Sequence, residues 1–154
     1  MPDQTYTHAS TSLTLAEKVK DYFQLVKFTL SFTVVFSCVI CYLLAPNIVI
    51  SNIHTLWMIF VLFIAGMLIT GSANAINQVV EKDTDALMKR TSTRPIASGR
   101  MTVNKGYTFA IITGAVGICM MTYFFNTKAA AISLLSLFIY AFIYTPLKKI
   151  TAIA

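Results

Sequence analysis

Three side chains that could bind a divalent cation recur at four-residue intervals in the middle of the sequence: Asn77, Glu81 and Asp85. At about 100° per residue on an α-helix these residues share one face, and Asn74 extends that face by a turn. Asp83 falls about 180° from Asn74, so the three neighbouring acids are not expected to be equivalent. Two carboxylates one turn apart, with amides beside them, suit Mg²⁺, which takes few protein carboxylates and shares its octahedron with water and phosphate oxygens.

Basic side chains follow this polar face closely. They are Lys89, Arg90, Arg94 and Arg100. A guanidinium group can donate two parallel hydrogen bonds to phosphate oxygens. Carboxylates for a metal beside bases for phosphate therefore predict a site for a metal-bound diphosphate or triphosphate.

A simpler alternative is that these acids and bases pair on a solvated loop, where the bases only set the orientation in a membrane. Two observations argue against it. Asn74 and Asn77 continue the polar face into an apolar segment, where polar side chains are costly and usually functional. Ion pairs on a surface would also require no common helical face.

The composition indicates an integral membrane protein. Only 12% of the 154 residues are charged, whereas a soluble domain carries about 25%. Residues 28–80 contain no Asp, Glu, Lys or Arg. The net charge is +6, but the bases flank apolar segments instead of forming one basic face, so a nucleic-acid partner is not expected.

Four apolar segments are long enough to cross a hydrocarbon core of roughly 30 Å as helices. They are residues 28–45, 56–80, 106–125 and 129–145. None alternates as a barrel strand would. We therefore predict an all-α, polytopic membrane helix bundle with four transmembrane helices in residues 21–154, preceded by a polar N-terminal tail at residues 1–20 that does not resemble a signal peptide.

Small residues in two of these segments would let helices approach closely. They are Gly66, Gly71, Ser72, Ala73 and Ala75 in one segment, and Gly114, Ala115 and Gly117 in the other. The three cysteines also lie inside apolar segments, which argues against a disulfide framework or a zinc site.

The basic residues predict the orientation. Alternate loops hold eleven of the twelve bases, and only Lys128 lies on the other side. By the positive-inside rule, the N-terminus, the loop at residues 81–105 and the C-terminus should face the cytoplasm, or the matrix in an organelle.

The central motif carries a resemblance to a known family. Asn77-x-x-x-Glu81-x-x-x-Asp85 resembles the first Asp-rich motif of the UbiA family of intramembrane prenyltransferases. The run from Asp83 through Arg90-Thr91 to Arg94-Pro95 resembles that of its protohaem IX farnesyltransferase (haem O synthase) branch. Residues Tyr144 to Lys148 match the Y-x-x-x-K element of the family, and the likeness covers nearly all of residues 20–150.

Two departures accompany this resemblance. Glu81 stands where the family usually has Asp, so its carboxylate is one methylene further from the backbone. Family members are also about twice as long, with around nine helices and a second Asp-rich motif. We therefore expect this chain to be an N-terminal half that is inactive in isolation.

The resemblance implies transfer of a farnesyl group from farnesyl diphosphate to a vinyl group of haem b. It implies that Asn77, Glu81 and Asp85 hold Mg²⁺ and that Arg90, Arg94 and Lys148 bind the diphosphate. Tyr144 would orient the diphosphate or steady the allylic cation.

The resemblance further implies a multi-pass protein of the bacterial inner membrane, with a downstream haem A synthase or cytochrome oxidase assembly as partner. Two alternatives stay open. One is a related prenyltransferase that acts on an aromatic quinone precursor. The other is a non-enzymatic membrane subunit or transporter.

Overall fold

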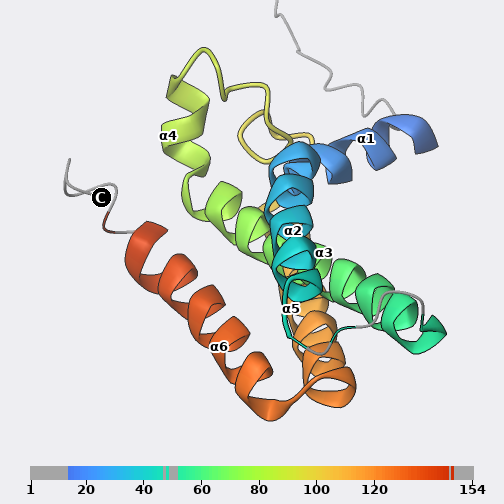
Figure 1. The fold of residues 1–154 in the computed structure, drawn as a ribbon. Coiled ribbons are helices and arrows are strands. Elements are labelled where there is room, and N and C mark those ends of the chain that lie inside the picture. The colour runs from blue at the N-terminus through green and yellow to red at the C-terminus, as the bar shows by residue number, and fades with distance from the viewer. Residues whose placement is uncertain (1–13, 47, 49–51, 146, 148–154) are drawn as a thin grey trace, which may run out of the picture.

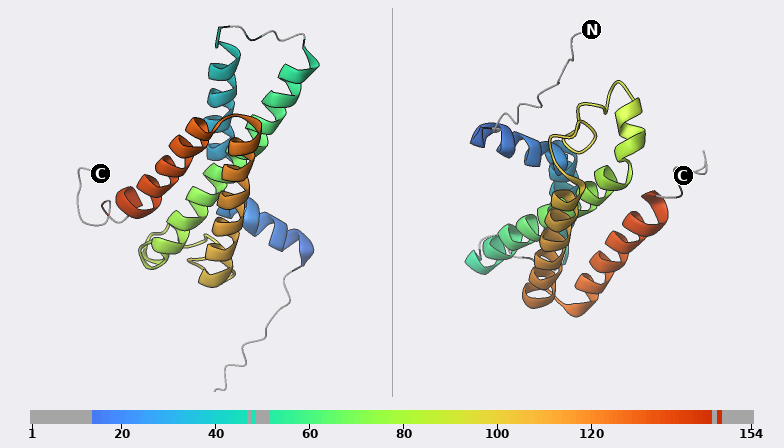
Figure 2. Two further views of the ribbon diagram at one scale, coloured as in Figure 1. Left: turned by 90° about the horizontal axis from the view of Figure 1, so that it is seen from below. Right: turned by 180° about the vertical axis from the view of Figure 1, so that it is seen from behind.

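The computed structural model describes residues 14–46, 48, 52–145 and 147. In this part of the chain the regular secondary structure is helical, without a strand, and residues 88–102 form a loop. Its elements are α1 (Leu15–Leu25), α2 (Phe28–Leu43), α3 (Ile53–Val80), α4 (Lys82–Leu87), α5 (Val103–Phe124), α6 (Thr127–Phe138) and the π-helix η1 (Ile139–Tyr144). The long helix α3 crosses the bundle and contacts α2, α5 and α6, while α4 and the loop after it lie at the end where α1 meets α2 (Figures 1 and 2). The predicted all-α bundle is confirmed.

Three helical segments are long and apolar enough to cross a membrane: Ile53–Val80, Val103–Phe124 and Thr127–Tyr144. The pair α1 and α2 makes a fourth if it is taken as one span bent by 52°. The predicted segments at residues 56–80, 106–125 and 129–145 agree with the three single spans to within a few residues, and the segment at residues 28–45 corresponds to α2 without α1. The last predicted segment is α-helical only to Phe138 and continues as the π-helix η1.

Helix α1 is not predicted from the sequence, which indicated a polar tail through residue 20. It begins with a capping box, in which Thr14 and Glu17 each bind the other's backbone N–H. Hydrogen bonds to the Glu17 carboxylate lower its pKa below the usual value, the larger effect coming from the backbone N–H of Thr14 and the smaller from its hydroxyl. This stabilisation is therefore present at neutral pH and is lost as the pH falls through that lowered pKa.

The break between α1 and α2 is held by two polar side chains of α3. Lys27 turns the chain there with a φ of 48°. Asn74 donates hydrogen bonds of 3.0 Å to the carbonyl of Val26 and to the hydroxyl of Ser31. Gln78 donates bonds of 2.9 Å to the last two carbonyls before Val26. Backbone groups that the helix end leaves unpaired thus gain partners inside the bundle.

Helices α3 and α5 lie close together because small residues face each other. The hydroxyl of Ser72 donates a 2.7 Å hydrogen bond to the carbonyl of Ala110. A Cβ atom at Gly117 would lie 2.7 Å from Cγ1 of Ile69 and 3.2 Å from the carbonyl oxygen of Ala65. The close approach predicted from the small residues is confirmed at this contact.

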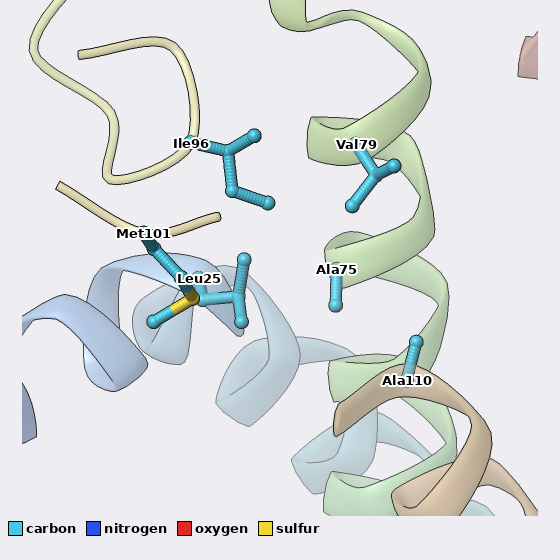
Figure 3. Packing of buried hydrophobic residues seen from close by; sticks show 6 residues of the cluster. All are labelled: Leu25, Ala75, Val79, Ile96, Met101 and Ala110. Carbon is cyan, nitrogen blue, oxygen red and sulfur yellow. The ribbon is translucent and has the colours of Figure 1, made fainter. Parts of the chain in front are cut away.

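A small apolar core fixes the loop that follows α4. It joins α1, α3, α5 and that loop through Leu25, Ala75, Val79, Ile96, Met101 and Ala110 (Figure 3). Ile96 and Met101 belong to the loop, and both are buried. The loop is therefore packed against the bundle at Ile96 and Met101, although other residues of the loop are exposed.

Gly117→Ala should lower the thermal stability of the protein in detergent or nanodiscs. In a helix interior, Ala is normally more stable than Gly by about 1 kcal/mol. Here, however, the added methyl group would have to displace Ile69 and the α3 backbone. We expect a net loss of about 1–3 kcal/mol, as for other overpacked contacts. Ala115→Val, at an exposed position of the same helix, is the matched control, and an equal loss in both variants would contradict the close contact.

Candidate functional site

Asn77, Glu81 and Asp85 share one face, as predicted, and all three are buried, at 3%, 7% and 4% exposure. The helical hydrogen bonds continue through the junction of α3 and α4, from Glu81 N to the Asn77 carbonyl and from Asp85 N to the Glu81 carbonyl. The amide of Asn77 donates a 2.9 Å hydrogen bond to Oε2 of Glu81. Asp83 is exposed, so the predicted difference between the acids agrees with the structure.

Arg94 brings a positive charge to both carboxylates. Its Nη1 atom lies 2.5 Å from Oδ2 of Asp85 and 4.0 Å from Oε2 of Glu81. The loop reaches this position partly because Thr91, itself buried, donates a 3.0 Å hydrogen bond to the carbonyl of Asp85. Two buried acids therefore approach one guanidinium nitrogen from the same side of the helix.

A hollow of about 310 Å³ adjoins this cluster. Its lining comes from the helix junction, α4 and the loop: Glu81, Thr84, Asp85, Met88, Arg90, Thr91 and Arg94. Arg90 is exposed, so its guanidinium group can reach a ligand at the mouth of the hollow. The acids and two of the predicted phosphate-binding bases thus meet in one place.

Two other residues singled out in the sequence, Asn74 and Arg100, lie away from the hollow. Asn74 donates a hydrogen bond to the backbone between α1 and α2, so the part of the predicted polar face that belongs to the site begins at Asn77. Arg100 donates to Asp21 of α1 at 3.0 Å and does not line the hollow. Lys148, predicted to bind diphosphate, lies outside the described residues.

Tyr144 is at the end of η1, with 38% of its surface exposed and its ring stacked on Tyr140 at 5.4 Å between centroids. It is not among the described residues that line the hollow. The next residue, Thr145, is fully buried and lies 3.5 Å from the amide oxygen of Asn77. Thr145 was missed because a single Thr in an apolar run has no periodic signal.

The donor set suits a metal that brings most of its own ligands. Among the described residues no group of three or more His, Cys, Asp and Glu side chains gathers as a metal site. The cluster instead offers two carboxylates and one amide. Such a set fits Mg²⁺, which keeps several waters and binds substrate phosphates, better than it fits Ca²⁺, which takes six to eight oxygen ligands.

The chain matches the family model described as "UbiA prenyltransferase family" over residues 34–154. The chain belongs to the UbiA prenyltransferase family. The match includes the whole Asn77–Arg94 cluster, so the acids and bases described above lie inside the region that defines the family.

Two similar sequences carry the same name, protoheme IX farnesyltransferase. The chain is 41% identical to protoheme IX farnesyltransferase of Flavobacterium psychrophilum, over 87% of this chain and 44% of that protein. It is 43% identical to the protein of the same name from Cytophaga hutchinsonii, over 91% of this chain and 48% of that protein. The chain thus spans about half the length of the curated relatives that it matches.

A solved structure from work on digeranylgeranylglyceryl phosphate synthase in membranes has a similar fold. The two superpose with a TM-score of 0.76 over 86% of this chain and 45% of the other, at 22% sequence identity. At this identity the likeness concerns the arrangement of the helices.

Arg94→Gln should destabilise the fold because it leaves Asp85 buried without its counter-charge. We expect a loss of about 1–3 kcal/mol in the free energy of unfolding, less than for a fully buried pair, since 22% of the Arg94 side chain is exposed. Adding Asp85→Asn should recover much of this loss, because the two changes act on one interaction. Arg90→Gln is the matched control, and an equal loss there would contradict the special position of Arg94.

Proposed function

We propose that this protein is a protohaem IX farnesyltransferase, which transfers farnesyl from farnesyl diphosphate to a vinyl group of haem b. The observation that carries the proposal is the meeting of two buried carboxylates with Arg94 beside a hollow at the end of α3. Family membership supports prenyl transfer. The shared name of the relatives supports farnesyl and haem as substrates.

In this proposal Asn77, Glu81 and Asp85 hold Mg²⁺ on the side of the hollow. When bound, the metal would neutralise diphosphate oxygens and so favour departure of the diphosphate. The burial of the two carboxylates matters for this function because charges interact more strongly where water is excluded. Glu81 and Asp85 also keep Arg94 beside the place assigned to the diphosphate.

The bases would stabilise charge that grows on the leaving diphosphate while the allylic C–O bond breaks. Arg94 is held in place before substrate arrives, and such preorganised groups stabilise a transition state without having to reorganise. Arg90, at the mouth of the hollow, and Lys148 would add donors as the diphosphate enters. We assign Tyr144 to the farnesyl group and not to the diphosphate, because the face of its ring can stabilise an allylic cation.

The distribution of bases supports an orientation in which the site faces the cytoplasm, and the bacterial relatives support a position in the bacterial inner membrane. In that orientation the water-soluble diphosphate head reaches the Arg90 side of the hollow, while the farnesyl tail stays in the apolar bundle. A haem A synthase or an assembling cytochrome oxidase would then receive the product.

The acceptor is tested by product analysis. Cells that lack their own haem O synthase should make haem O when the complete gene containing this sequence is expressed, as measured by chromatography and mass spectrometry of extracted haems. Formation of a prenylated quinone precursor without haem O would assign the protein to the other kind of prenyltransferase. Absence of any prenylated product, with the protein inserted, would favour a non-enzymatic membrane subunit.

Asp85→Asn in the complete protein should reduce haem O formation by a factor on the order of 10² or more, the scale of losing one electrostatic contact to a transition state. Asp83→Asn is a matched control, since it makes the same chemical change two residues away on an exposed side chain. Membrane insertion is checked by immunoblotting of isolated membranes. Equal activity of the two variants would overturn the assigned metal site.

Glu81→Asp should keep or increase activity, because the shorter acid is the one usual in the family at this position. The measurement is haem O formed per amount of inserted protein. Complete loss, with Asp83→Asn still active, would show that the longer side chain of Glu81 has a geometry of its own beside Asn77 and Arg94.

A further inference from the structure

We propose that α1 lies among the lipid headgroups and that its outward face binds anionic phospholipids. This face is defined by three apolar residues, Leu15, Val19 and Phe23, together with two lysines, Lys18 and Lys20. The proposal does not depend on the reaction that the protein catalyses.

The three apolar residues of this face are all exposed. Leu15 is 81% exposed, Val19 50% and Phe23 52%. Their four-residue spacing places them on one side of the helix, in line along its axis. An apolar stripe of this kind on a short helix with charged flanks is typical of helices that lie in the plane of a membrane interface.

The two lysines lie on either side of the apolar stripe. At about 100° per residue, Lys18 falls about 60° beyond Leu15 and Lys20 about 60° beyond Phe23 on the opposite edge. Both are exposed. Lysine side chains can extend their amines to the headgroups while their methylene stems rest on apolar surface. Glu17 lies about 60° beyond Lys20, towards the attached side of the helix, so the apolar stripe itself is bordered by a lysine on each side. These lysines complement an anionic leaflet better than they complement an apolar protein face.

The remaining side of α1 is attached to the protein. Asp21 and Leu25 are buried, and Asp21 accepts a 3.0 Å hydrogen bond from Nε of Arg100. Arg100 also donates to the carbonyl of Thr93, next to Arg94. The fold therefore fixes which side of α1 faces outward, and it connects α1 to the loop that carries Arg94.

The bend between α1 and α2 directs α1 away from the axis of α2. The chain bends by 52° between α1 and α2. Helix α1 thereby projects sideways at the end of the bundle where α4 and the loop lie (Figure 1; Figure 2, right). Because α2 onward is apolar enough to enter the hydrocarbon core, a helix that leaves its axis at this end comes to lie along the surface.

The test uses tryptophan fluorescence in nanodiscs. Trp57 is the single tryptophan of the sequence, so Trp57→Phe with Phe23→Trp places one reporter on the outward face. Nanodiscs contain either brominated phosphatidylglycerol or brominated phosphatidylcholine at the same mole fraction, in the same mixture of unlabelled lipids. We expect the anionic quencher to be at least about twice as effective, because lysines near a membrane surface attract anionic lipid.

Lys18→Gln with Lys20→Gln should bring the two quenchers to equal effect while quenching by brominated phosphatidylcholine stays unchanged. That unchanged value shows that α1 is still folded against the lipid. Lys82→Gln with Lys89→Gln removes the same charge from exposed sites in and after α4 and should leave the preference intact.

Three results would overturn the proposal. If neither lipid quenches the reporter introduced by Phe23→Trp, that face of α1 lies against protein or in water. Equal quenching by both lipids in the reporter protein with its lysines intact shows no preference for anionic headgroups. A loss of preference with Lys82→Gln and Lys89→Gln as large as with the α1 lysines would assign the effect to overall charge.

Discussion

Polar side chains buried in an apolar bundle need hydrogen-bond partners, and the partners of α3 attach most of the other elements to it. Ser72 binds the backbone of α5. Asn74 binds the break between α1 and α2. Asn77 contacts Thr145 after η1. Because an unpaired polar group in a membrane interior costs several kcal/mol, each contact strongly favours one position of the element that supplies the partner.

The same constraint produces the candidate site. Glu81 and Asp85 continue the polar side of α3 past its end, where two buried carboxylates require a counter-charge. Arg94 supplies it from a loop that is held by Thr91 and by the core around Ile96. The buried acids thus contribute to the position of the loop together with Thr91 and the apolar core, and the folded loop leaves a hollow lined by both signs of charge.

The fold was predictable where the signal is long and repetitive. Lengths of apolar sequence such as residues 56–80 leave few structures other than a membrane helix, since every backbone group has to be paired within the segment. Helix α1 was not predicted because Lys18 and Lys20 make its composition polar. Its order depends on the capping box at Thr14 and on the contact of Asp21 with Arg100, which joins residues far apart in the chain.

The sequence by itself determined the membrane character of the chain, its apolar helices and the shared face of Asn77, Glu81 and Asp85, because helical periodicity is a local property. Only the tertiary structure decided which basic side chain forms an ion pair with which acid. Arg94 and Arg100 lie in the same loop, yet one binds Asp85 and the other binds Asp21. A loop has no periodicity from which such a choice can be read, so the choice depends on how its backbone packs against α1, α3 and α5.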